Sequence, residues 1–182
     1  YLNLEQVTLV GWSLSGSIVV TYAHKYEGYR LKALGLLDCC LFPFSPEDWN
    51  SYNSKNYNMD DWNQKYRLWY TDPETYIENF VNRVRKGLTE GEVQMVRDEI
   101  GKTPPWIGFA LHTDWCHSDC ASLLPDLKIP VIIFSGESKG HSSSMGRHYQ
   151  SLIQTYCEHH EFHTGGHMLF FIEHERFNSL LE

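Results

Sequence analysis

The stretch VTLVGWSLSG at residues 7–16 decides the fold. It begins as a continuous apolar run, which is typical of a buried strand in a parallel sheet. The pattern Gly-x-Ser-x-Ser-Gly follows at once, and the chain then repeats apolar side chains at helical spacing. A serine between small residues on a strand-to-helix turn is typical of a nucleophile elbow. We therefore predict that Ser13 is presented at the carboxyl edge of a sheet, beside the N-terminus of a helix.

Length and composition exclude several classes of protein. The chain has 182 residues, 42% of them hydrophobic, and a formal net charge of -8, which argues against nucleic-acid binding because phosphates require clustered Lys and Arg. The five cysteines match neither a disulfide framework nor a zinc ribbon, so we expect a reduced, cytoplasmic compartment. No signal peptide or membrane-crossing run is found. Because the chain begins with Tyr1 and reaches a core-type strand by residue 7, we expect a fragment that lacks upstream strands.

The remaining pattern predicts an α/β fold with a mainly parallel sheet flanked by helices. Strands at 7–10 and 31–37 enclose a helix from residue 15, which makes a βαβ unit. Further strands are expected at 131–134 and, more weakly, at 157–163, with helices at 148–156 and 168–181. We predict three segments: core 1–38, a helical insertion 39–126 over the strand ends, and core 127–182.

The insertion shows no alternating strand pattern. Helices are expected at 61–70, 73–86, 89–100 and 106–112, the third capped by Thr89. Ser45-Pro46-Glu47-Asp48 also resembles a helix start, with serine as the cap and proline at the first position.

A serine nucleophile needs a base that accepts its proton, and His167 is the favoured candidate. It follows Gly165-Gly166 after the last strand candidate and precedes the final helix, so a loop places it near the sheet edge. Its unperturbed pKa of about 6.5 suits general base catalysis. Four other histidines are nearby and are expected to lie at the surface: His159, His160, His163 and His174.

The acid that would orient the histidine has two candidates, each at the end of a predicted strand. Asp38 follows the strand at 31–37, and Glu137 follows the strand at 131–134. We favour Asp38 and keep Glu137 as the alternative. The Cys-His-x-Asp-Cys cluster at 116–120 has no second half, so no metal site is expected, and no cofactor is implied.

Three stretches in this order resemble the α/β-hydrolase superfamily, most closely its lipase/esterase and non-haem haloperoxidase-like branch. Residues 11–16 are similar to the nucleophile elbow of the family. The stretch IPVIIFSG at 129–136 is similar to the strand that usually carries the acid. The stretch GHMLFFIEHERF at 166–177 is similar to the C-terminal segment that carries the catalytic histidine. The family usually has Asp at the position of Lys139, whereas some members carry the acid where Asp38 stands. The resemblance implies that the Leu14 N–H is one oxyanion donor and that a second donor lies before residue 1.

The resemblance also implies that the insertion is a cap domain whose aromatic side chains line the substrate pocket. The residues expected to line it are Trp12, Phe42, Trp62, Trp69 and Trp106. A wider set of cap aromatics comprises Trp49, Tyr52, Tyr57, Trp62, Trp69, Tyr70, Trp106 and Trp115.

The leading hypothesis is a serine hydrolase acting on an ester or related acyl substrate through Ser13, His167 and Asp38. Its partner would be a small molecule with an apolar acyl or ring group, and neither a nucleic acid nor a membrane. The alternatives are a cofactor-independent oxygenase of heteroaromatic rings and a non-catalytic homologue. The sequence leaves the oligomeric state open.

Overall fold

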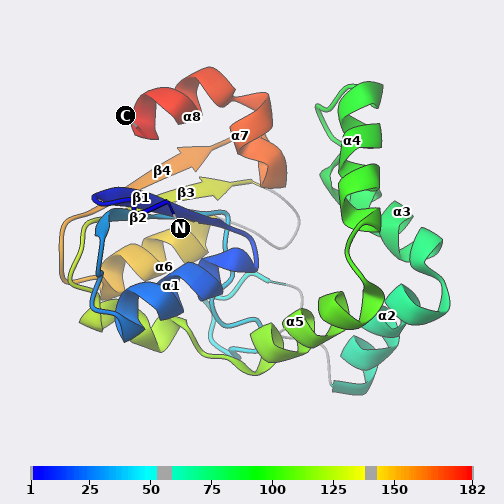
Figure 1. Ribbon diagram of the computed structural model, residues 1–182, viewed down its shortest axis with the longest axis horizontal. Coiled ribbons are helices and arrows are strands. Elements are labelled where there is room, and N and C mark those ends of the chain that lie inside the picture. The colour runs from blue at the N-terminus through cyan, green and yellow to red at the C-terminus, as the bar shows by residue number, and fades with distance from the viewer. Residues whose placement is uncertain (1, 53–58, 138–142, 182) are drawn as a thin grey trace.

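The computed structural model describes residues 2–52, 59–137 and 143–181, without the side chains of Met59, Trp62 and Lys65. Its centre is a parallel sheet (Figure 1). The strands, in their order across the sheet, are β1 (Val7–Trp12), β2 (Leu31–Leu37), β3 (Val131–Gly136) and β4 (Cys157–Phe162). The predicted α/β class with a parallel sheet flanked by helices is therefore confirmed.

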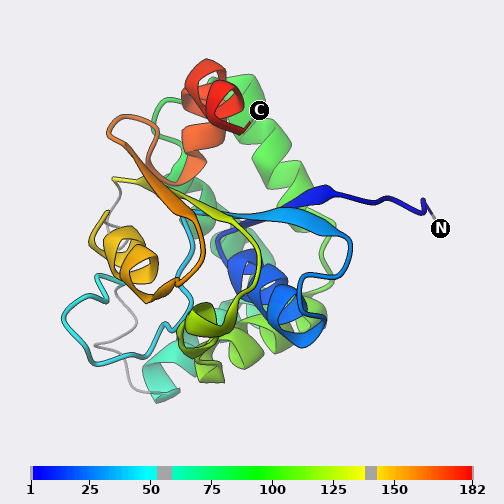
Figure 2. The same ribbon diagram turned by 90° about the vertical axis from the view of Figure 1, so that its left-hand side faces the viewer.

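Helices cover both faces of this sheet. Helices α1 (Ser15–Lys25) and α6 (Ser143–Leu152) lie on one face, and α7 (Leu169–Ile172) and α8 (His174–Leu181) lie on the other (Figures 1 and 2). The alternation of side chains along a strand explains the two layers, since Val131 and Ile133 pack into one cluster while Ile132 and Phe134 pack into the other. Both faces of β3 are therefore apolar, which is why this strand reads as a continuous hydrophobic run.

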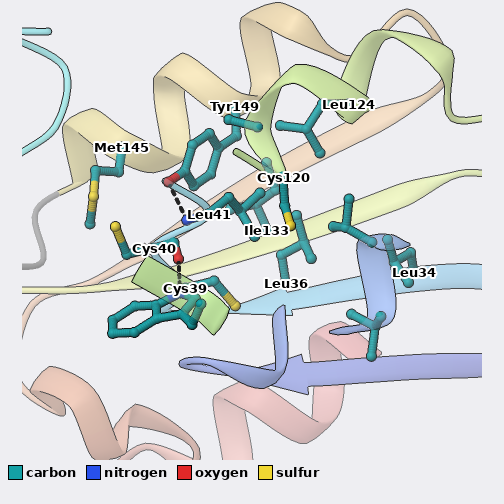
Figure 3. Packing of buried hydrophobic residues seen from close by; sticks show 14 of the residues in the cluster. Leu34, Leu36, Cys39, Cys40, Leu41, Cys120, Leu124, Ile133, Met145 and Tyr149 are labelled. Atoms are coloured by element: carbon teal, nitrogen blue, oxygen red, sulfur yellow. Dashed lines mark hydrogen bonds between the residues drawn. The ribbon is translucent and has the colours of Figure 1, made fainter. Parts of the chain in front are cut away.

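The larger cluster fixes the chain just beyond β2. Tyr149 on α6 is 1% exposed, and its hydroxyl accepts a hydrogen bond of 2.9 Å from the Leu41 backbone N–H (Figure 3). The indole N–H of Trp115 donates to the Cys40 carbonyl at 2.7 Å. These bonds satisfy buried backbone groups in an irregular segment, so the exit from β2 is held firmly.

The helical segment after β2 stands to one side of the sheet (Figure 1). It contains α2 (Met59–Thr71), α3 (Pro73–Val84), α4 (Glu90–Gly101) and α5 (Pro105–His117), followed by a 3-10 helix at Ala121–Asp126. Asp72 caps α3, and Thr89 with Glu92 forms a capping box on α4, as the sequence predicted for Thr89. Within the described ranges, none of the helices combines the length and the apolar character required to cross a bilayer.

Helix α5 extends five residues beyond its expected end, helix α6 begins five residues before its expected start, and three further differences have a clear physical cause. No helix starts at Ser45, because buried Asn50 donates to the carbonyls of Pro43 (3.1 Å) and Ser45 (2.8 Å) and so holds a loop. Helix α6 ends before Thr155 and Tyr156. The Thr155 hydroxyl donates to the Ile129 carbonyl, and the Tyr156 carbonyl accepts from the Val131 N–H. The final helix is divided at Glu173, whose backbone leaves the helical region and whose side chain bonds to the preceding loop.

Candidate active site

Ser13 occupies a strained turn between β1 and α1. Its φ of 55° lies in the left-handed region, which non-glycine residues rarely adopt. Its N–H donates to the Leu37 carbonyl at 3.0 Å. The Ser15 hydroxyl accepts from the Trp12 N–H at 2.9 Å and donates to the Trp12 carbonyl at 2.6 Å. Ser15 occupies the position where the elbow motif has glycine, and its two hydrogen bonds to the Trp12 backbone stabilise the turn.

Close packing under the turn requires Gly16 to have no side chain. A Cβ atom there would lie 2.2 Å from Cys39 Sγ and 2.6 Å from Cys39 Cβ. The Cys39 thiol is itself fixed, because it donates to the carbonyls of Gly11 (3.1 Å) and Leu37 (3.3 Å). The end of β2 therefore packs directly against the start of α1.

Replacing Gly16 tests this packing. We expect Gly16→Ala to lower the free energy of unfolding by about 1–3 kcal/mol, because the added methyl group overpacks a rigid site. The matched control is Gly91→Ala on α4, where nothing lies within 4 Å of the added atom. There the substitution should raise stability by up to about 1 kcal/mol, since alanine favours a helix. Urea denaturation measures both, and an unchanged Gly16→Ala midpoint would contradict the packing described.

Asp38 and His167 form a buried pair next to this turn. Asp38 follows β2, and its carboxylate accepts from the Gly136 N–H at 2.9 Å through Oδ1. Its Oδ2 lies 2.6 Å from His167 Nδ1, and the two side chains are 2% and 12% exposed. An ionised carboxylate only accepts hydrogen bonds, so Nδ1 is the donor in this contact, and in a neutral imidazole Nε2 is then the acceptor.

Glu137, the alternative acid, is placed elsewhere. Its side chain is 57% exposed, and its carboxylate lies 3.4 Å from His163 Nδ1. The structure therefore brings Asp38 to His167 and pairs Glu137 with another histidine. His163 and His174 are exposed, as expected, but His159 and His160 are half-buried, which corrects the prediction that both lie at the surface. Lys139 lies outside the described residues.

Trp12 contacts His167 through both a hydrogen bond and a ring contact. Its indole N–H donates to the His167 carbonyl at 2.9 Å, and its ring centroid lies 5.0 Å from the imidazole. The same ring packs edge-on against Phe170 of α7. The residue before the candidate nucleophile thus connects the turn to the loop that carries His167.

The loop before His167 is anchored by Glu173. Its Oε1 accepts from the Thr164 N–H (3.2 Å), the Thr164 hydroxyl (2.6 Å) and the Gly165 N–H (3.0 Å). Burial alone would raise the pKa of Glu173, but these hydrogen bonds outweigh it and leave the pKa below its usual value. The anchor therefore depends on an ionised carboxylate.

Glu173→Gln should lower the melting temperature at pH 7 by about 2–4 °C, since charge-assisted hydrogen bonds are replaced by weaker ones. A carboxylate with a depressed folded pKa stabilises the protein above its unfolded pKa of about 4.3, and this contribution is lost as the pH falls through the lower folded value. The difference between variant and wild type should therefore shrink below about pH 4. Glu175→Gln is the control, and an equal shift in both variants would argue against the anchor.

A cavity of about 520 Å³ opens above the turn and contacts both Ser13 and His167. On the side of the sheet it is also lined by Leu14 and by residues 164–166. On the other side it is lined by residues of α2, α3 and α5. The lining residues of these three helices and of the segment before α2 are Tyr52, Tyr66, Phe80, Asn82, Arg83, Val84, His112 and Trp115. Residues of the helical segment and of the turn at Ser13 therefore line the same cavity.

Four of the five aromatic residues expected to line the pocket are absent from the described lining of this cavity, which corrects the prediction for Trp12, Phe42, Trp69 and Trp106. Trp12 packs beneath His167, and Phe42 packs against the larger core cluster. Trp69 is buried and stacks on Tyr76 at 4.3 Å, whereas Trp106 is 63% exposed. The Trp62 side chain and Tyr57 lie outside the described parts of the chain. Of the wider set, Tyr52 and Trp115 do line the cavity.

Sequence reasoning missed Tyr66, His112 and Arg83. The spacing of α3 contained a usable signal, because Tyr76, Phe80 and Arg83 recur at steps of four and three and so share a face. This face therefore combines two aromatic side chains with one charged side chain, Arg83.

Leu14 lies at the amino end of α1 and lines the cavity. The first N–H groups of a helix have no partner within it, and the helix dipole places partial positive charge there. These features suit a developing oxyanion. The role of the Leu14 N–H as an oxyanion donor remains a prediction.

No protein-family model matches the sequence, and no curated protein matches it significantly. Solved structures do match over nearly the whole chain. A bromoperoxidase from Bacillus anthracis has a TM-score of 0.86 at 19% identity, covering 99% of this chain and 67% of its own. An esterase from Exiguobacterium antarcticum gives 0.82 at 19% identity, with 99% and 66% covered. MGS-M2, an α/β-hydrolase enzyme from a Medee basin deep-sea metagenome library, gives 0.73 at 17% identity, with 99% and 65% covered.

The chain has the α/β-hydrolase fold.

The resemblance drawn from the sequence is thus confirmed at the level of the fold. The chain spans about two thirds of the length of these α/β-hydrolase-fold structures. Among the described residues of this α/β-hydrolase fold, no group of three or more His, Cys, Asp or Glu side chains is arranged to hold a metal ion. All five cysteines are free thiols, and four of them are buried.

Proposed function

We propose that this protein is a serine hydrolase acting on an ester or related acyl substrate. The observation that carries the proposal is the buried contact between Asp38 and His167 at the edge of the cavity that Ser13 also lines. A nucleophile, a base and an orienting carboxylate have to meet at one accessible point for acyl transfer. The esterase and hydrolase names of similar structures support the same class of reaction.

In the proposed mechanism, Asp38 holds the proton on Nδ1 of His167 and stabilises the imidazolium that forms. Nε2 removes the Ser13 hydroxyl proton while Oγ attacks the ester carbonyl carbon. The resulting oxyanion accepts a hydrogen bond from the Leu14 N–H. The tetrahedral intermediate collapses, the C–O bond to the alcohol breaks, and His167 protonates the leaving oxygen. Water, deprotonated by His167, then hydrolyses the acyl-enzyme and restores Ser13.

We further propose that residues 39–126 act as a cap over this centre. The cavity lies between the helices of this segment and the turn at Ser13, and Tyr66 and Trp115 in its wall are nearly buried. A pocket of a few hundred Å³ with aromatic walls suits a small organic substrate. The cap would exclude water from the acyl group and strengthen the electrostatic interactions within the site.

Rapid mixing with p-nitrophenyl butyrate tests the proposal. An acyl-enzyme mechanism with slow deacylation releases a burst of p-nitrophenol before the steady state, with an amplitude close to the concentration of active sites. A folded protein, as judged by circular dichroism and a cooperative melting curve, that shows no hydrolysis above the buffer rate of several p-nitrophenyl esters would contradict the proposed activity.

A further inference from the structure

We infer that the cavity selects acyl substrates that carry a carboxylate remote from the ester, and that Arg83 and Lys86 bind this carboxylate. The inference rests on the proposed function, because it assigns the substrate class of the same site. Arg83 lies in the last turn of α3, and Lys86 lies in the turn that follows this helix. Both line the cavity together with Ser13 and His167.

Neither cation is neutralised by the part of the protein that the structure describes. Arg83 and Lys86 have no Asp or Glu oxygen within 4.0 Å among the described residues. Two acidic side chains of α3 and α4 bind other partners: Glu90 lies 3.2 Å from Arg85, and Glu78 lies 2.7 Å from Arg97. Glu137 lines the cavity but faces His163. Two cations are therefore left at one wall of a cavity in a protein whose net charge is -8.

The charge of Arg83 acts on the cavity wall. Its guanidinium lies over the Phe80 ring, 5.5 Å from the centroid, and Phe80 is itself a lining residue. Burial raises the pKa of Tyr66, and the nearby Arg83 charge opposes that rise. The Arg83 side chain itself is exposed and so can reach a ligand in the cavity.

These features match a bifunctional acyl group. A guanidinium binds a carboxylate through two parallel hydrogen bonds, and a lysine ammonium adds a flexible point charge. The aromatic wall would contact the methylene chain between the carboxylate and the ester carbonyl. A monoester of a short dicarboxylic acid has this chemistry, whereas a simple alkanoate ester leaves both cations unpaired.

Two esters with the same number of acyl carbons test the selection: mono-p-nitrophenyl glutarate and p-nitrophenyl pentanoate. We expect wild type to favour the glutarate ester in kcat/KM. Arg83→Gln and Lys86→Gln should each lower kcat/KM for the glutarate ester about fivefold, the size expected of one exposed ionic contact, and change the pentanoate value less than about twofold. Arg85→Gln, which removes a charge of the same sign paired with Glu90 outside the cavity lining, is the matched control. Equal losses for both esters, or the same loss in Arg85→Gln, would overturn the inference.

Binding separates this inference from the proposed function. Monomethyl glutarate and methyl pentanoate are titrated into Ser13→Ala by calorimetry, so that no turnover is needed. Tighter binding of monomethyl glutarate, weakened by Arg83→Gln and by added salt, would support the inference even if wild type hydrolysed no ester. No preference for the anionic ester, or no measurable binding of it, would contradict the inference and leave ester hydrolysis as a separate result.

Discussion

Ser13→Ala is expected to lower kcat for ester hydrolysis by a factor on the order of 10⁵–10⁶, the size of effect seen when a serine nucleophile is removed. The physical reason is that alanine has no oxygen to form the acyl-enzyme, so only binding and oxyanion stabilisation remain. Alanine is also smaller than serine, and the backbone bonds of the turn do not use the Ser13 side chain. The rate with p-nitrophenyl butyrate measures the loss.

The chain offers a matched control in a second serine–histidine pair. Ser135 Oγ lies 2.9 Å from His159 Nε2, but Ser135 is buried in β3 and lies outside the lining of the 520 Å³ cavity. Ser135→Ala should therefore keep the activity within a few-fold of wild type. If Ser135→Ala lost activity while Ser13→Ala kept it, the assignment of the nucleophile would be wrong.

Asp38→Asn is expected to lower kcat by about 10⁴-fold. An amide in place of the carboxylate can donate to Nδ1 and so favour the wrong tautomer, and it no longer stabilises the imidazolium. The amide oxygen can still accept from the Gly136 N–H, which lies 2.9 Å from the Asp38 carboxylate, so the fold should survive. A melting curve checks this.

Glu137→Gln is the comparison for Asp38→Asn, because Glu137 also follows a strand and lines the cavity but faces His163. Its kcat should stay within a few-fold of wild type. A large loss in Glu137→Gln together with an active Asp38→Asn would show that the contact between Asp38 and His167 is not the catalytic one.

The sequence predicted the sheet core well, because local patterns there agree with the tertiary structure. The run at 31–37 became β2 with the expected bounds, and the elbow at 11–16 lies between β1 and α1. Prediction failed where a polar side chain competes for the backbone groups of a nearby segment. Ser45-Pro46 has a good helix-start pattern, but buried Asn50 takes the backbone groups of that segment into a loop.

The choice between the two candidate acids could not be made from spacing alone. It depends on register: Leu37 of β2 pairs with Phe134 of β3, so Asp38 lies beside the end of β3 and accepts from the Gly136 N–H. Glu137 comes one residue later, where its N–H bonds to the Phe162 carbonyl. The prediction of the aromatic residues that line the pocket was also wrong, because it too depends on tertiary packing. Trp69 and Trp106 are on helices that the sequence located, but helix packing buries one and exposes the other.

The central claim is that Ser13 is the nucleophile, and the most direct measurement is the site of covalent labelling. The protein is incubated with a fluorophosphonate probe, digested, and analysed by tandem mass spectrometry. The account predicts one phosphonyl adduct, located on Ser13 and absent from Ser13→Ala. A folded protein that carries no adduct, or an adduct on another residue that persists in Ser13→Ala, would contradict it.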